Sequence, residues 1–260
     1  MLRKSRFPGI LTWIVLLFLY LPILLLVVNS FNTSKTGGNW AGFTLQWYSD
    51  LFLARDIWFA LRNTLFVAFV ATAISTILGT TAACALHRYK GRIQNAHYVL
   101  VYTPLVVPEI LTGVSLLLFF VALKVQLGLT TVIIAHVTFC IGYVAMAVLA
   151  RLQDFDDTIL EAAHDLGANT WQTTWKVLVP VIFPGILSGA LLAFTLSVDD
   201  FVISFFVAGP GSTTLPIQIY SMIRRGNLAL INALSTLLLA VTFLAILIGQ
   251  TIAIFKKNST

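Results

Sequence analysis

The chain has 260 residues, of which 58% are hydrophobic and only 10% charged, and its formal net charge is +6. A soluble domain usually carries about 25% charged residues, so this composition excludes a soluble protein of one or two domains. Long apolar runs indicate a membrane protein instead, because water could not accommodate so much apolar surface.

The apolar runs predict six transmembrane helices, because each run supplies the roughly 20 apolar residues that a helix needs to cross a bilayer. They lie near residues 10–31, 63–86, 98–123, 129–150, 183–208 and 230–255. The first run is too long for a cleaved signal peptide, and no small-residue cleavage site follows it promptly, so we expect a retained helix. The chain is therefore predicted to be an all-α polytopic membrane protein.

The basic residues predict which side of the membrane each connection faces. With a cytoplasmic N-terminus, ten of the sixteen Lys and Arg residues lie in inside segments, which favours cytoplasmic N- and C-termini. The inside residues are Arg3, Lys4, Arg6, Arg88, Lys90, Arg92, Arg151, Lys176, Lys256 and Lys257, and the outside residues are Lys35, Arg55, Arg62, Lys124, Arg224 and Arg225. The net charge therefore reflects topology, and no basic patch with interleaved aromatic residues supports binding to nucleic acid.

Three acidic residues fall inside predicted spans. Glu109 follows Pro108 in the third span, with Pro104 one turn earlier, and the two prolines are expected to disrupt the helix there, which is tolerated beside a cavity. Asp199 and Asp200 are adjacent in the fifth span, where a continuous helix would point them about 100° apart, so we expect one to face the pathway and the other a neighbouring helix or the partner chain. No Lys or Arg lies clearly in a span core, so we expect unpaired carboxylates that face a cavity and attract a cation. A structural or proton-relay role is the alternative.

The histidine and cysteine residues do not predict a metal site. His136 and Cys140 are four residues apart in the fourth span and could share a helix face. Two ligands do not make a structural zinc site, so we expect both to be buried by packing. Cys84 also lies in an apolar run, and neither cysteine belongs to a CxxC pattern. No metal, disulfide or cofactor is expected.

One polar segment, near residues 152–180, separates the fourth and fifth spans on the predicted cytoplasmic side. Residues 158–166 have the pattern of a short amphipathic helix. Gly167 suits a left-handed helix stop, and Asn169 begins a capping-box pattern. We therefore predict a helix, a tight glycine turn and a second helix that ends at Pro180. Short helices are marginal in water, so this hairpin needs a partner to dock on; an ordinary solvated loop is the alternative.

The segment EAAHDLG, separated by nine residues from VLVP, resembles the EAA motif of ABC-importer permeases. The matching residues are Glu161, Ala162, Ala163, Gly167 and Pro180, while Val177 and Val179 stand where Ile and Leu are more usual. In that family the loop is the coupling helix, which sits in a groove of a cytoplasmic ATPase subunit. The resemblance implies the six-span type I (MetI-like) permease fold, with residues 1–260 as one transmembrane domain. No G-x-x-x-x-G-K-[ST] motif occurs, so ATP hydrolysis is expected on a partner and the chain is not expected to be an enzyme.

Further segments resemble the polyamine permeases, which import spermidine and putrescine, over nearly the whole chain. They are ALRNTLFVAF, HRYKGR, LSVDDFVIS and LPIQIYSMIRRG. The resemblance implies that Trp47, Glu109, Ser197, Asp199 and Asp200 bind the substrate, although Glu109 stands where Asp is expected, which alters its reach. Carboxylates suit ammonium groups, and an aromatic wall suits the methylene chain and attracts cations. A simple interfacial role is an equal alternative for Trp47.

This resemblance implies an ATP-driven importer of the bacterial inner membrane, in which the chain supplies half of the pathway. The implied partners are a second, homologous permease, two ATPase subunits, an extracytoplasmic polyamine-binding protein and membrane lipid. Alternatives are a permease of the same fold for another solute such as ferric ion or an anion, an intramembrane enzyme, and a structural subunit. An anion would demand basic lining, an enzyme would need a nucleophile with its base or metal ligands within the spans, and the three acids argue against a purely structural subunit.

Overall fold

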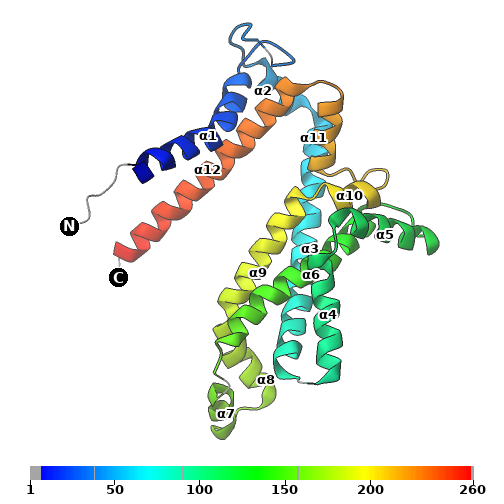
Figure 1. The fold of residues 1–260 in the computed structure, drawn as a ribbon, viewed down its shortest axis with the longest axis vertical. Helices are drawn as coiled ribbons and strands as arrows, with labels where there is room; N and C mark the ends of the chain where they lie inside the picture. Colours follow the sequence, from blue (N-terminus) through cyan, green and yellow to red (C-terminus); the bar gives the residue numbers. More distant parts are fainter. Residues whose placement is uncertain (1–6, 38, 90, 157, 259–260) are drawn as a thin grey trace. The chain divides into compact units, whose positions relative to one another are not determined.

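The computed structural model describes residues 7–37, 39–89, 91–156 and 158–258, and these residues are almost entirely helical (Figure 1). The helices are α1 (Phe7–Asn29), α2 (Gln46–Leu53), α3 (Arg55–Arg88), α4 (Arg92–Val106), α5 (Glu109–Ala122), α6 (Leu129–Gln153), α7 (Thr158–Asp165), α8 (Thr170–Thr173), the π-helical turn η1 (Thr174–Leu178), α9 (Val179–Asp199), α10 (Val202–Val207), α11 (Leu215–Arg224) and α12 (Leu228–Asn258). The chain divides into two compact units, Met1–Ile57 with Ile219–Thr260, and Trp58–Gln218. The predicted all-α class is confirmed.

Five helices in the described part of the chain are long and apolar enough to cross a membrane. They are Leu11–Asn29, Arg55–Arg88, Leu129–Gln153, Thr170–Asp199 and Leu228–Thr251. Two shorter helices, Gln94–Val106 and Glu109–Ala122, meet the same criterion together and are bent by 109° relative to each other. Taken as one broken span, this pair completes the six spans that the hydrophobic runs predict.

Prolines interrupt the third span. Pro104 lies inside α4, and Val107 and Pro108 separate α4 from Glu109, the first residue of α5. Proline lacks an N–H and disfavours helical conformation in the preceding residue, so Pro108 ends one helix and allows the next to begin. The predicted disruption near the prolines is confirmed, and the bend is far sharper than a kinked single helix over residues 98–123 would give.

The fifth span ends earlier than predicted. Its helix α9 stops at Asp199, Asp200 is extended with φ −61° and ψ 121°, and α10 follows as a separate short helix. The predicted continuous helix over residues 183–208, and the 100° separation of the two aspartates, are therefore wrong. The physical reason is that the Asp200 carboxylate accepts hydrogen bonds from the backbone N–H groups of Ile203 and Ser204 and starts a new helix, as an N-cap does.

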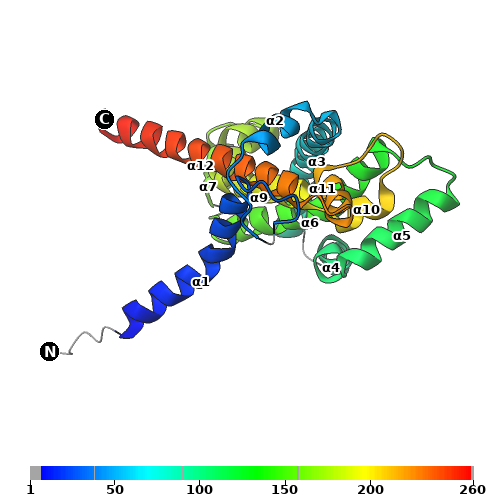
Figure 2. The same ribbon diagram turned by 90° about the horizontal axis from the view of Figure 1, so that it is seen from above.

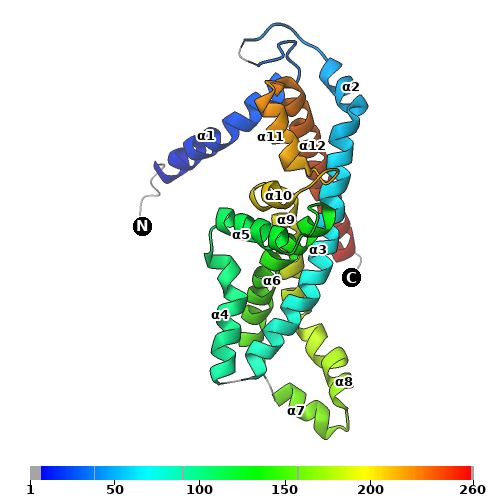
Figure 3. The ribbon, with the colours of Figure 1, turned by 90° about the vertical axis from the view of Figure 1, so that its right-hand side faces the viewer.

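Helix α6 supplies much of the core of the unit Trp58–Gln218 and runs beside α9 (Figures 1 and 3). The two backbones approach closely at Gly189, where an added Cβ atom would lie 3.1 Å from the Cα atom of Val144. Small residues at contacts are typical of membrane helices, because lipid offers no hydrophobic force between helices and close packing must hold them together. This rigid pair positions the residues that follow α9.

The other unit contains α1, α2, α12 and the loop that joins α1 to α2. Helices α1 and α12 meet at one end and diverge towards their termini (Figure 2). The buried side chain of Asn32 organises the loop, because it donates to the Asn39 carbonyl oxygen and accepts from the Ala41 N–H. Most large apolar side chains of α1 are exposed, as expected of a helix that faces lipid or another membrane chain.

Candidate functional site

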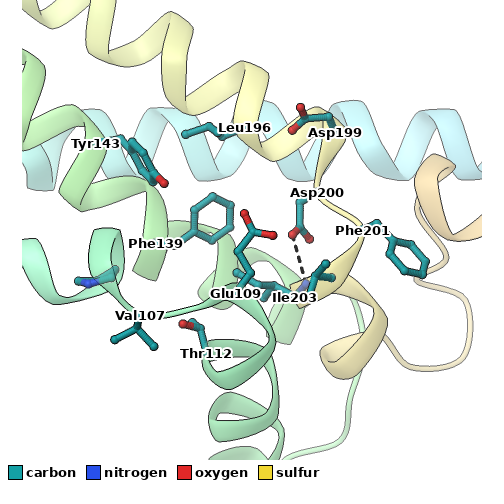
Figure 4. A pocket seen from close by; sticks show the side chains of 12 residues that line it. Val107, Glu109, Thr112, Phe139, Tyr143, Leu196, Asp199, Asp200, Phe201 and Ile203 are labelled. Carbon is teal, nitrogen blue, oxygen red and sulfur yellow. Dashed lines mark hydrogen bonds between the residues drawn. The ribbon is translucent and has the colours of Figure 1, made fainter.

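A cavity of about 260 Å³ lies beside the breaks in the third and fifth spans, within the unit Trp58–Gln218 (Figure 4). The lining residues are Pro104, Val107, Glu109, Thr112, Phe139, Tyr143, Leu196, Asp199, Asp200, Phe201, Val202 and Ile203. All three acids that the sequence places in spans are therefore brought together. None of these lining residues is Lys or Arg, so the cavity wall has the charge and the aromatic rings that suit an organic cation.

Two of the three carboxylates are open to the cavity. Glu109 is exposed in the first turn of α5, where the N-terminal end of a helix favours a negative charge. Asp199 is exposed as the last residue of α9. Figure 4 shows the Glu109 side chain rising from α5 towards the segment that holds Asp200. A cation could reach Glu109 and Asp199 without displacing a buried hydrogen bond.

Asp200 differs from the other two acids because it is buried, with 9% of its surface exposed. One carboxylate oxygen accepts the Ile203 N–H at 3.2 Å, the dashed contact in Figure 4. The other accepts the Ser204 N–H at 2.8 Å and lies 3.2 Å from Nε2 of His136. The expectation that all three acids lack a partner within the chain is therefore wrong for Asp200. That expectation considered only Lys and Arg, whereas the partner is a histidine. The contact is with a neighbouring helix, α6, as expected for one of the two aspartates.

His136 links Asp200 to Ser197 and Ser204. Its Nδ1 lies 2.6 Å from Oγ of Ser197, and its Nε2 lies 2.9 Å from Oγ of Ser204. The predicted burial of His136 and Cys140 on α6 is confirmed. Ser197 is also buried and is not among the cavity-lining residues, so it lies behind the side chains that line the cavity. Sequence reasoning missed His136 as a site residue, although a histidine in an apolar span signals a need for polar partners.

Trp47 belongs to the unit formed by Met1–Ile57 and Ile219–Thr260. Its indole N–H donates to the backbone carbonyl oxygen of Asn32 at 2.8 Å, and its side chain is half-buried. The loop that joins α1 to α2 therefore holds Trp47 in place, and Trp47 is not among the residues that line the cavity.

The first helix of the loop after α6 begins beside Asp156. The hydroxyl and the backbone N–H of Thr158 bond to this carboxylate, with the N–H at 3.0 Å, and they lower the pKa of Asp156 below its ordinary value. Helix α7 ends just before Gly167, whose φ of +84° is the left-handed conformation that stops a helix. The predicted short helix and glycine turn are confirmed.

The second helix of this loop begins at a capping box and does not end at Pro180. Asn169 and Gln172 exchange two hydrogen bonds of 2.9 and 3.1 Å, which confirms the predicted capping pattern. From there α8 continues through η1 into α9, so the predicted end is wrong. Pro180 lacks an N–H, and the wide turn in which the Val179 N–H bonds to the Thr174 carbonyl lets the helix pass it.

The residues of the EAA segment lie on the outside of α7. Glu161 and Ala162 are exposed and Ala163 is half-buried. Glu161 also lines a second cavity, of about 650 Å³, together with Arg88 at the end of α3. The alanines leave little bulk on this helix, so a second protein could approach its backbone closely.

The family of binding-protein-dependent transport system inner membrane components matches residues 75–257. The chain belongs to this family. It is 39% identical over 236 residues to the spermidine/putrescine transport system permease protein PotC of Escherichia coli (strain K12), covering 91% of this chain and 89% of that protein. It is 45% identical over 229 residues to the putrescine transport system permease protein PotI of the same strain, covering 85% and 82%. Haemophilus influenzae PotC is 37% identical over 247 residues, which is 95% of each chain.

Solved structures of importer permeases share the fold of this inner membrane component. A chain of a bacterial ABC transporter that imports the acidic polysaccharide alginate superposes with a TM-score of 0.75 at 15% identity, covering 96% of this chain and 98% of that one. The MetNI methionine ABC transporter gives 0.61 at 23% identity, covering 79% and 96%. The predicted type I importer permease fold is confirmed. Since one of these relatives imports an anionic polymer, the fold does not determine the substrate.

Membership of this family gives the chain its general role. It is a multi-pass permease subunit of the inner membrane that works with an ATPase subunit and a binding protein. It is not itself an enzyme, because the ATPase is a separate partner. The substrate must therefore be argued from the cavity and from the named relatives.

Proposed function

We propose that this chain is the permease subunit of an ATP-driven ABC importer for the polyamines spermidine and putrescine. The observation that carries the proposal is the cavity in which Glu109, Asp199 and Asp200 gather without a lining Lys or Arg. The similarity to PotC and PotI, at 39% and 45% identity, points to the same substrates.

The cavity chemistry suits a flexible dication or trication. Ammonium groups that leave water need carboxylates to replace their hydration, and Glu109 and Asp199 are exposed for that purpose. The rings of Phe139 and Tyr143 line the same cavity and can pack along the methylene chain while attracting its charges. We assign Asp199, Asp200, Glu109 and Ser197 to substrate binding, and Trp47, at the start of α2 in the other unit, is assigned to substrate binding from the family resemblance alone.

The coupling role is assigned to the hairpin after α6. Glu161, Ala162, Ala163, Gly167 and Pro180 carry the EAA pattern. The three residues of the EAA triplet lie on the short helix α7, Gly167 forms the turn after it, and Pro180 lies in the first turn of α9. Its shape suits a groove on an ATPase subunit, since small side chains permit close approach and a fixed turn transmits displacement to α9.

The proposed complex contains this chain, a homologous permease, two ATPase subunits and an extracytoplasmic polyamine-binding protein. The whole chain acts as one transmembrane permease domain and supplies half of the pathway. Both termini face the cytoplasm, as the distribution of Lys and Arg favours. Cysteines at Tyr89 and Arg225, introduced one at a time into a chain with Cys84→Ser and Cys140→Ser, test this orientation. An impermeant thiol reagent on intact cells should label position 225 and not position 89; the reverse pattern would invert the topology.

Uptake measurements test the substrate. The complete complex, reconstituted in vesicles with ATP inside, should accumulate labelled spermidine or putrescine when the binding protein is outside. Ferric ion and a neutral amino acid serve as controls, and mass spectrometry of the small molecules that co-purify with the binding protein identifies the native ligand. ATP-dependent uptake of ferric ion without uptake of polyamine would contradict the proposal and favour a ferric-ion permease of the same fold. Polyamine uptake by a complex that lacks this chain would indicate that the chain is a structural subunit.

A further inference from the structure

One histidine lies at the centre of a buried polar chain that joins both sides of the break in the fifth span. His136 is 1% exposed and comes from α6. Its Nδ1 reaches Ser197 on α9, and its Nε2 reaches Ser204 on α10 and the Asp200 carboxylate between those helices. The imidazole therefore contacts the helix before the break, Asp200 in the break and the helix after it.

The contact with Asp200 fixes the proton on one ring nitrogen of His136. A carboxylate only accepts hydrogen bonds, so a bond to Asp200 requires the proton on Nε2 of His136. Nδ1 shares a hydrogen bond of 2.6 Å with the Ser197 hydroxyl, which can either donate or accept. The ring thus orders Ser197 with one nitrogen and Asp200 with the other.

We propose that His136 is a positioning residue of the substrate site, which sets the geometry of the α9–α10 break and with it the direction of the cavity carboxylates. The inference rests on the proposed function and deepens it. His136 does not line the cavity, so it acts through Asp200 and does not contact the substrate. Ser197, also absent from the lining, acts in the same way through His136.

The adjacent residues Asp199 and Asp200 therefore have different roles in substrate recognition. The Asp200 carboxylate is turned into the protein, where two backbone N–H groups and His136 bind it. That orientation leaves Asp199 at the exposed end of α9. Without His136 the break would relax and the spacing between Asp199 and Glu109 would change, so affinity should fall more than the rate of translocation.

Three substitutions separate positioning from simple packing. His136→Gln can place an amide donor near the position of Nε2 and keep the bond to Asp200, whereas the shorter His136→Asn cannot reach it. His136→Leu fills the space without any hydrogen bond. We expect the KM for spermidine uptake to rise at least about tenfold in the Leu and Asn variants, with a much smaller change in the maximal rate, and to return to within about threefold of the original value in the Gln variant.

A second readout does not depend on the identity of the substrate. Val202, at the start of α10, lines the cavity and can be changed to cysteine in a chain with Cys84→Ser and Cys140→Ser. The rate at which a small thiol reagent labels position 202 should change in the Leu and Asn variants and return in the Gln variant. If the complex imports no polyamine but labelling follows this pattern, the proposed function fails while the positioning role stands.

Equal loss in the Gln, Asn and Leu variants, in step with the amount of assembled complex, would overturn the proposal and leave packing as the role of His136. An unchanged KM and labelling rate in the Leu variant would overturn it as well. If the His136 variants do not assemble, Ser197→Ala removes only the bond to Nδ1. The proposal expects that variant to raise KM and alter labelling, and normal values would contradict it.

Discussion

Two spans of this permease are broken beside the same cavity, and they are broken by different means. In the third span, Pro108 lacks an N–H and disfavours a helical conformation in the residue before it, so a local backbone signal marks the break. In the fifth span, no residue forbids the helix, and Asp200 leaves it because its carboxylate binds two N–H groups of α10 and a histidine of α6. The first break can be read from a local pattern, whereas the second depends on side chains far apart in sequence.

The largest effect is expected at the second break. Asp200→Ala would leave His136 and the N–H groups of Ile203 and Ser204 without their acceptor, and each buried donor left unsatisfied typically costs about 1–3 kcal/mol. Uptake should be lost and the thermal unfolding midpoint of the purified complex should fall. Asp200→Asn, which keeps an acceptor oxygen, should lose at least about tenfold in uptake with a smaller loss of stability. A normal midpoint in the Ala variant would show that the buried network does not hold the break.

The turn at Gly167 is a third helix interruption, and it lies away from the cavity. Changing it tests whether a helix stop can affect the coupling of uptake to ATP hydrolysis without altering the substrate site. Its φ of +84° is strongly unfavourable for a β-branched residue, by about 1–3 kcal/mol. Gly167→Val should therefore uncouple uptake from ATP hydrolysis while the chain still inserts and the binding protein still docks. Substrate uptake and stimulation of the ATPase are measured in the same vesicles, with Gly167→Asn as the milder control because Asn tolerates this conformation. Wild-type uptake by the Val variant would remove this loop from the coupling path.

The two exposed acids allow the two breaks to be compared directly, because Asp199 ends a helix at one break and Glu109 begins a helix at the other. Asp199→Asn should cut polyamine uptake about tenfold, and Glu109→Gln somewhat less, since either loss removes one carboxylate contact with the substrate. Neither side chain is buried, so the unfolding midpoint and the yield of assembled complex should stay near normal. Labelled spermidine uptake and pull-down of the partner permease separate the outcomes. Loss of assembly together with uptake would indicate that these acids brace helices.

The smallest effect is expected at the proline break. Pro108→Ala restores an N–H, but Pro108 already has the extended ψ of 136° that precedes a helix. The bend should persist, and the chief loss is the stiffness that proline gives the unfolded chain, about 0.4–1 kcal/mol. A slightly lower unfolding midpoint with uptake within about twofold is the expected result. A large loss of uptake would mean that the bend depends on proline alone.

These two breaks also show which parts of the structure could be predicted from the sequence. Hydropathy predicted the spans, and Gly167 with the capping pair Asn169 and Gln172 predicted the hairpin, because each signal is local. The disruption at Pro108 was predictable for the same reason. The exit of Asp200 from its helix was not, because the run from residue 183 to residue 208 is apolar throughout apart from the two aspartates and scattered hydroxyls. The partner of Asp200, His136, comes from another span, and no periodicity in the sequence indicates that contact.

The passage of the helix through Pro180 has a mechanical consequence. From Thr170 to Asp199 the chain is one helical stretch of 30 residues, a rod of roughly 45 Å at the usual rise per residue. The hairpin assigned to the ATPase sits at one tip of this rod, and a cavity carboxylate sits at the other. A tilt or rotation imposed on the first tip is carried to the second along continuous helix, and the irregular turn η1 lies close to the hairpin end of the rod.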